Sequence, residues 1–154
     1  MSDGRHVLIV EARFYEDIAD QLVTGATAVL SESGVESKRL SVPGVFEIPA
    51  AIRFAARAMD TEKQSERYDG FLALGCVIRG ETDHYDHICR EASHALMRLA
   101  VDHSLALGFG VLTCASYEQA RVRAAVDEKN KGAEAAFACL RMMELRQTFL
   151  PTPI

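Results

Sequence analysis

Short apolar runs alternate along this chain with longer segments of helical periodicity, and this alternation is the feature that most constrains its fold. Strands are expected at the apolar runs His6–Val10, Val35–Val42, Phe71–Val77 and Gly108–Thr113. Strands separated by helices form right-handed βαβ units, in which helices cover both faces of a parallel sheet. The sequence therefore predicts an α/β fold, a three-layer αβα sandwich around a central four-stranded parallel sheet.

The segments between these strands carry signals that begin and end helices. The first helix has apolar residues at helical spacing and ends at Gly34. The strand that follows, Val35–Val42, is less apolar than the others, which predicts a place at a sheet edge. Pro43-Gly44 turns the chain into a second helix from about Glu47 to Met59, in whose first turn Pro49 is tolerated.

Three further helices are expected in the second half of the chain. A long one runs from His84 to about Val101, a short one begins near Tyr117, and the last begins near Lys131. The buried face expected for the last helix consists of Ala133, Ala136, Phe137, Leu140 and Met143.

Size and charge exclude several classes of protein. The 154 residues are expected to form one domain, residues 1–154, with flexible termini at 1–5 and 151–154. The tail at 151–154 is expected to lie over the surface or a neighbouring subunit. Net charge is −5 and Lys and Arg are scattered, so no nucleic-acid partner is expected. No apolar run approaches the roughly 18 residues of a membrane span, and residues 1–4 do not resemble a signal peptide. We expect a cytoplasmic protein without membrane contacts.

The four cysteines are far apart and form no C-x-x-C pair. In an unsecreted chain they are expected to be reduced, mostly buried and structural. They are Cys76, Cys89, Cys114 and Cys139.

The segment Gly75–His87 is the strongest indication of chemistry. It reads G-C-V-I-R-G-E-T-D-H-Y-D-H and follows the apolar run Phe71–Leu74. A strand that passes through such a turn into a helix presents unpaired backbone N–H groups at the positive end of the helix dipole, where phosphates and carboxylates bind. His84 lies in the first helical turn, so a group that titrates near neutral pH is beside this site. The pattern indicates chemistry on a small phosphorylated molecule.

Other candidate residues follow the remaining strands. Phe14 follows the first strand, Val45-Phe46-Glu47 the second, Arg79–His84 the third and Thr113–Ser116 the fourth. Ligands of parallel α/β sheets bind beyond the carboxyl ends of the strands. These four segments are therefore expected to meet at one end of the sheet.

The turn and its histidines could also occur in a chain that binds no anion there. Plain capping by Thr82 or Asp83 accounts for the residue types of the turn, and His84 could be a surface residue. His84 and His87 could bind a metal together with Asp86 or Cys89, although their spacing matches no closed metal site.

The remaining candidates could likewise have purely structural roles. Phe14 could belong to the core or stack on a flat heterocycle. Glu47 could simply be favoured by the dipole of its helix. Arg123 and Lys131 lie in a charged segment and could be solvated. Arg123 is expected to point away from the ligand end of its own sheet, so any substrate it binds would be that of a neighbouring subunit.

Four motifs, in order along the chain, resemble those of the lumazine synthase family. They are Pro43–Pro49 (P-G-V-F-E-I-P), Gly75–His87, Phe109–Thr113 (F-G-V-L-T) and Asn130–Gly132 (N-K-G), and the similarity runs from about Val7 to Phe149. The resemblance implies a flavodoxin-like sheet and a transferase that needs neither metal nor organic cofactor. In the penultimate step of riboflavin synthesis, this enzyme condenses 5-amino-6-(D-ribitylamino)uracil with 3,4-dihydroxy-2-butanone 4-phosphate. The products are 6,7-dimethyl-8-ribityllumazine, phosphate and water.

The resemblance also implies roles for site residues by motif position. Around the pyrimidine and the ribityl chain it places Phe14, Val45, Phe46, Glu47, Val77, Ile78, Phe109 and Lys131. Around the phosphate it places Gly80, Glu81, Thr82 and Arg123. Phe14 would stack on the pyrimidine, Glu47 would bind ribityl hydroxyls and His84 would transfer protons. Phe109, Arg123 and Lys131 would come from the adjacent subunit of a five-fold ring, and riboflavin synthase is implied as a functional partner.

Some residues depart from the family pattern. Glu81 and Asp83 replace smaller or neutral residues, so the phosphate must be held by backbone N–H groups with these carboxylates turned outward. Tyr15 replaces a common Asn. The altered loop Val126–Lys129 favours a homopentamer over a larger shell.

Two rival interpretations of the sequence remain: a non-catalytic relative, and a flavodoxin-like signalling or electron-transfer domain. The intact His84, Arg123 and Lys131 argue against the first, and the lack of an acidic cluster after the first strand argues against a phospho-receiver.

Overall fold

The computed structural model describes residues 4–151, and the strands in this range form a four-stranded parallel sheet of order β2-β1-β3-β4. The strands are β1 (His6–Ala12), β2 (Glu36–Val42), β3 (Gly70–Ile78) and β4 (Leu107–Cys114). The predicted fold class is confirmed. So is the edge position of the second strand, whose side chains are almost all exposed.

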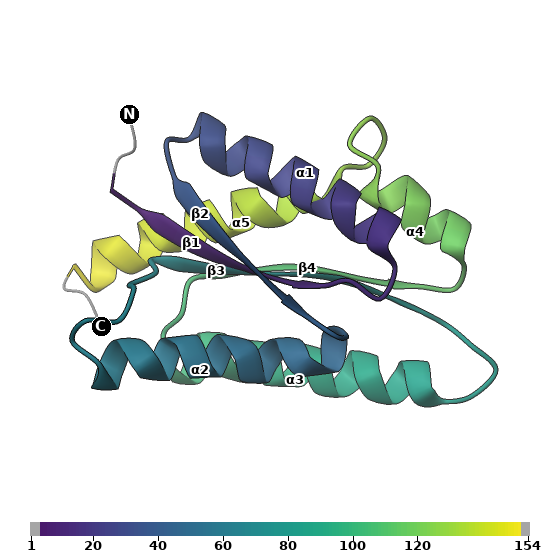
Figure 1. The fold of residues 1–154 in the computed structure, drawn as a ribbon, viewed down its shortest axis with the longest axis horizontal. Coiled ribbons are helices and arrows are strands. Elements are labelled where there is room, and N and C mark those ends of the chain that lie inside the picture. Colours follow the sequence, from purple (N-terminus) through teal and green to yellow (C-terminus); the bar gives the residue numbers. More distant parts are fainter. Residues whose placement is uncertain (1–3, 152–154) are drawn as a thin grey trace.

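Helices cover both faces of the sheet (Figure 1). One face carries α1 (Glu16–Glu32), α4 (Tyr117–Ala124) and α5 (Lys131–Phe149). The other carries α2 (Ile48–Thr61) and α3 (His84–Asp102), with the 3₁₀ turn η1 (Val45–Glu47) directly before α2. No helix within residues 4–151 has both the length and the apolar character needed to cross a membrane.

Each face of the sheet has its own apolar core, because successive side chains of a strand point to opposite faces. On β1, Val7 and Ile9 pack in the core under α1 and α5, whereas Leu8 and Val10 pack in the core under α2 and α3. This burial on both faces explains why the central strands appear in the sequence as continuous apolar runs.

Strand β1 continues two residues beyond its predicted end at Val10. The extension includes Glu11, which is only 2% exposed. The apolar pattern placed the strand end before this residue because carboxylates are rarely buried unless they are paired.

The expected buried face of the last helix is wrong at Phe137, whose side chain is 60% exposed, although Ala133, Ala136, Leu140 and Met143 are buried. Helix α5 packs closely on α1, so closely that a side chain at Gly132 would overlap the backbone of Leu22. Small residues allow this approach, and it leaves the Phe137 ring on the outer side of the helix.

The termini were expected to be flexible at residues 1–5 and 151–154. Residues 1–3 and 152–154, which include most of the tail expected on the surface or a neighbour, lie outside the described residues.

Candidate active site

A cavity of about 590 Å³ lies where β1 and β3 end and α3 begins. Three of the four expected segments meet here: Phe14 from the β1–α1 turn, Val45-Phe46-Glu47 from η1, and His84 from the first turn of α3. The end of β3 completes the wall with Val77 and Ile78. The carboxyl ends of neighbouring parallel strands therefore form a common cavity, as the topology predicts.

Aromatic rings line one side of this cavity. Phe14 is 74% exposed, so the alternative that it belongs to the core is wrong. Its ring meets Tyr15 edge to face, with centroids 5.0 Å apart. Phe46 is exposed as well. Exposed rings at a cavity mouth suit contact with a flat heterocycle.

Two side chains in the wall are free to act on polar groups of a ligand. Within residues 4–151, neither the imidazole of His84 nor the carboxylate of Glu47 makes a hydrogen bond or an ion pair. Both side chains are exposed. An imidazole without a protein partner is free to exchange protons with a bound ligand.

The turn between β3 and α3 has its own hydrogen-bond pattern. Thr82 Oγ1 accepts a 3.3 Å hydrogen bond from the backbone N–H of His84, whereas Asp83 makes no capping hydrogen bond. The Asp83 carboxylate instead lies 3.3 Å from Nε2 of His87. Capping by Thr82 therefore contributes to this helix start.

Gly80, Glu81 and Thr82 do not line the 590 Å³ cavity but stand in the exposed turn beside it. In the described part of the chain their backbone N–H groups donate no hydrogen bond. Arg79 is engaged elsewhere: its guanidinium lies 4.4 Å from the Tyr85 ring centroid and 3.2 Å from Asp86. The free donors at the positive end of α3 are thus the backbone N–H groups.

A second cavity of about 350 Å³ contains the remaining predicted residues, Phe109, Arg123 and Lys131, together with Thr113. It is formed by β4, α4 and α5 and shares no lining residue with the first cavity. A single chain therefore does not bring Arg123 and Lys131 together with Phe14 and His84. Thr113 lies at the expected end of the sheet, in register with Val77, but it lines this second cavity and not the first.

The cations of the second cavity have weak local partners. Nη1 of Arg123 donates a 3.1 Å hydrogen bond to the Gln119 carbonyl, and Nζ of Lys131 lies 2.8 Å from Glu134. Both residues are half-buried, and an ion pair as accessible to solvent as that of Lys131 with Glu134 contributes little. Each cation can therefore turn to an incoming anion.

Four residues of the first cavity were missed as site residues from the sequence: Tyr15, Gly44, Cys76 and Ile88. Ile88 lies one helical turn after His84 and thus on the same face of α3, and Cys76 precedes Ile78 by two positions on the same face of β3. Helical and strand periodicity could have identified both.

The cysteine thiols are poor nucleophiles here. Cys76, Cys114 and Cys139 are buried and Cys89 is half-buried, all as free thiols. Burial, followed by the neighbouring Cys114, raises the pKa of Cys76 to about 12, so its thiol stays protonated at neutral pH. Among residues 4–151, no cluster of three or more His, Cys, Asp or Glu residues is placed to hold a metal ion.

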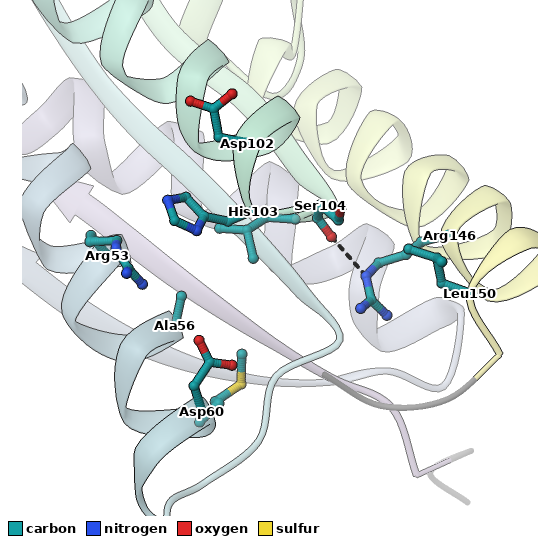
Figure 2. Close-up of a pocket in the computed structure, with 10 residues that line it drawn as sticks. Arg53, Ala56, Asp60, Asp102, His103, Ser104, Arg146 and Leu150 are labelled. Atoms are coloured by element: carbon teal, nitrogen blue, oxygen red, sulfur yellow. Dashed lines mark hydrogen bonds between the residues drawn. The ribbon is translucent and has the colours of Figure 1, made fainter.

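Another cavity, of about 380 Å³, lies at the opposite end of the sheet (Figure 2). Arg53 and His103 line one side, and Arg146 on the other side donates a 2.8 Å hydrogen bond to the Ser104 carbonyl. The carboxyl ends of α2, α3 and α5 meet there, and their dipoles, together with the Asp60 and Asp102 carboxylates, oppose the attraction of its arginines for phosphate. For a phosphorylated substrate, the cavity at the carboxyl ends of the strands is the better site.

A parallel α/β sheet with an aromatic, carboxylate and imidazole-lined cavity at its strand ends defines a protein that binds a small molecule. Comparison with known proteins narrows this class. Residues 4–147 match the family described as 6,7-dimethyl-8-ribityllumazine synthase. The chain therefore belongs to the 6,7-dimethyl-8-ribityllumazine synthase family, which consists of transferases.

Individual relatives are similar to this chain over almost their whole length. The 6,7-dimethyl-8-ribityllumazine synthase of Agrobacterium fabrum is 51% identical over 92% of this chain and 95% of its own. That of Paramagnetospirillum magneticum is 48% identical, covering 92% and 94%. 6,7-Dimethyl-8-ribityllumazine synthase 1 of Rhizobium meliloti is 51% identical, covering 92% of each chain.

Proposed function

We propose that this enzyme condenses 5-amino-6-(D-ribitylamino)uracil with 3,4-dihydroxy-2-butanone 4-phosphate to form 6,7-dimethyl-8-ribityllumazine, phosphate and water. One observation carries the assignment of roles: Phe14, Glu47 and His84 line the same cavity. In this proposal Phe14 stacks on the pyrimidine, Glu47 binds ribityl hydroxyls, and Val45 and Phe46 support them. The backbone of Val77 and Ile78 meets the heterocycle.

His84 is proposed to transfer protons. Imine formation, loss of phosphate and ring closure each move a proton, and a free imidazole suits such steps near neutral pH. The amine of one substrate is itself the nucleophile, so the protonated thiol of Cys76 needs no catalytic role. Holding the two substrates close together in a reactive orientation contributes much of the rate acceleration.

Phosphate is proposed to bind the turn at Gly80, Glu81 and Thr82. The free backbone N–H groups of this turn support the assignment, because such groups at a helix start bind anions. The Asp83 carboxylate already faces His87, away from a phosphate on the backbone. Arg123 adds a charged donor that anchors the phosphate and stabilises it as it leaves.

Phe109, Arg123 and Lys131 are proposed to act on the site of an adjacent subunit. Their separate cavity in one chain supports this, because a ligand in the first cavity does not contact them. Exposed rings on several elements are apolar surface that subunit contacts would cover; they are Phe54, Phe109, Phe137 and Phe149. We propose a cytoplasmic homopentamer with shared sites, and riboflavin synthase as its functional partner.

The reaction has a direct test. The purified protein is incubated with both substrates, and the fluorescence of the lumazine product is followed. Product formation that requires both substrates and releases one phosphate per lumazine supports the proposal. A protein that binds the uracil but never forms product is a non-catalytic relative, and one that binds flavin mononucleotide instead belongs to the flavodoxin-like rivals.

A further inference from the structure

The most unusual charge in this structure is the carboxylate of Glu11, in the sheet next to α1. It is the one charged side chain among residues 4–151 that is almost fully buried. Two arginines satisfy it: Arg13 Nη1 lies 2.6 Å from Oε1, and Arg39 Nε and Nη2 lie 2.7 and 2.8 Å from Oε2 and Oε1. These contacts have the short, bidentate geometry of strong charge-assisted hydrogen bonds.

The two arginines connect Glu11 to different parts of the fold. Arg39 belongs to the edge strand β2 and is half exposed. Arg13 lies in the turn between β1 and α1, and its other guanidinium nitrogen, Nη2, forms an ion pair with Asp20 on α1. Arg13 therefore bridges the end of β1 to the first turns of α1, across the residues that join them.

Phe14 is the residue directly after Arg13. Its backbone makes no hydrogen bond to any other residue in the range 4–151, and its ring is largely exposed. On its helical side the turn is held by the hydrogen bond from the Ala19 N–H to the Tyr15 carbonyl. On its strand side, Ala12 is paired with Val42 in the sheet, and the Arg13 side chain ties this strand end to α1. The Phe14 ring itself contacts only the neighbouring Tyr15 ring among the aromatic rings of residues 4–151, so its position depends on how this turn is held.

We propose that Arg13 is a positioning residue for ligand binding: held between Glu11 and Asp20, it fixes the turn so that the Phe14 ring stands ready to stack on a flat heteroaromatic ligand. A ring held in its bound place loses less conformational entropy when the ligand arrives. This inference rests on the stacking role proposed for Phe14. Glu11, Arg13 and Asp20 all lie outside the four family motifs.

The alternative is that the cluster only stabilises the fold. Arg13 and Arg39 distinguish the two roles, because both pair with the same buried carboxylate but only Arg13 connects to α1 and the Phe14 turn. Arg13→Gln and Arg39→Gln both remove one partner from Glu11. A purely stabilising cluster responds to the two changes in the same way, whereas a positioning residue does not.

The test measures the dissociation constant of the fluorescent product 6,7-dimethyl-8-ribityllumazine by titration with the full-length protein, so catalysis is not required. Phe14→Ala sets the scale, because loss of an aromatic stacking partner weakens binding of a flat base by about fivefold or more. We expect Arg13→Gln to approach that value and Arg39→Gln to stay within about twofold of wild type. Urea unfolding of each variant reports stability separately.

Asp20→Ala keeps the inference testable if Arg13→Gln does not fold. Asp20 is mostly exposed, so its loss removes the bridge to α1 with little effect on the core. We expect weaker product binding than in wild type at nearly unchanged stability. Restoration of binding by Asp20→Glu, which keeps the carboxylate, supports the bridge.

The outcomes separate the inference from the proposed function. If Phe14→Ala weakens binding while Arg13→Gln and Asp20→Ala bind like wild type, the positioning role is overturned and the stacking role stands. If Arg39→Gln weakens binding as much as Arg13→Gln, the cluster is only stabilising. If Phe14→Ala itself has no effect, the proposed stacking fails and the positioning role fails with it.

Discussion

His84 and His87 lie three residues apart near the start of α3, and both are exposed, yet only His84 lines the cavity. This pair allows proton transfer to be separated from general effects on the helix. We expect His84→Ala to reduce kcat about tenfold, at the low end of the range for general acid–base residues, because an activated amine reacts in part without help. His87→Ala is the matched control and should keep the wild-type value.

The measurement is steady-state lumazine formation between pH 6 and pH 8. A His84→Ala enzyme with the wild-type kcat across this range would remove the residue from proton transfer. Equal losses in both variants would point to the helix start rather than to the imidazole.

Arg123 and Arg121 form a second matched pair, on α4. Arg123 lines the second cavity, whereas Arg121 is exposed and pairs with Glu118 and Glu128. A lost charged hydrogen bond to phosphate is worth about 1.5–3 kcal/mol, or roughly 10- to 150-fold in affinity. We therefore expect Arg123→Ala to raise the KM for the phosphorylated ketone by that factor, with a much smaller change for the uracil and none in Arg121→Ala. Equal rises for both substrates would contradict the phosphate role.

At the scale of elements, the close approach of α1 and α5 depends on the absence of a side chain at Gly132. A Cβ at this position would overlap the Leu22 carbonyl group, so the helices must separate to admit it. Overpacking of this kind costs about 1–3 kcal/mol, and we expect Gly132→Ala to lower the free energy of unfolding by that amount. Gly80→Ala is the control, since nothing lies within 4 Å of a Cβ there. Urea denaturation compares the two, and equal midpoints would show that the contact yields without cost.

The ion pair between Glu11 on β1 and Arg39 on β2 makes the free energy of unfolding depend on pH. Burial by itself would raise the pKa of this carboxyl, but the hydrogen bonds and charges of Arg39 and Arg13 outweigh it, so the pKa is lowered. A lowered pKa gives stability that is present above the ordinary value near 4.5 and is lost as pH falls through the folded-state pKa. We expect Glu11→Gln to be less stable than wild type at pH 7, and the difference to shrink as the pH falls below 4.5.

Urea unfolding of both proteins between pH 7 and pH 3 measures this difference. Exposed carboxylates whose pKa values are also lowered, such as those of Glu66 and Glu118, are common to both proteins and cancel. A difference that stays constant down to pH 3 would mean that ionisation of Glu11 is not what stabilises the cluster.

At the scale of the whole molecule, the proposed shared site requires a second copy of the chain. A cyclic, head-to-tail ring would bring the cavity with Arg123 on one subunit to the cavity with His84 on the next. We expect mixed rings of His84→Ala and Arg123→Ala subunits to recover activity above that of either variant alone, since some interfaces then combine two intact halves. Activity after subunit exchange and light scattering of the mixture are the measurements. An active monomer, or mixed rings without recovery, would contradict shared sites.

The sequence by itself determined the layout of the sheet and the local part of the site. Strand and helix periods, Gly34 at the end of α1, and His84 in the first turn of α3 are set by residues a few positions apart, so a single sequence predicts them. The order of parallel strands then placed Phe14, Glu47 and His84 at a common end of the sheet.

Only the tertiary structure decided which charged side chain is buried and which large side chain is exposed. Glu11 is buried because Arg39, 28 positions away, reaches it from another strand. Phe137 is exposed because α5 packs through a face that contains Gly132, Ala136 and Cys139 and does not include it. The sequence already predicted that Arg123 points away from its own ligand site, but only the packing of α4 and α5 beside β4 places it in one cavity with Phe109 and Lys131. Each outcome depends on long-range packing, which local periodicity does not encode.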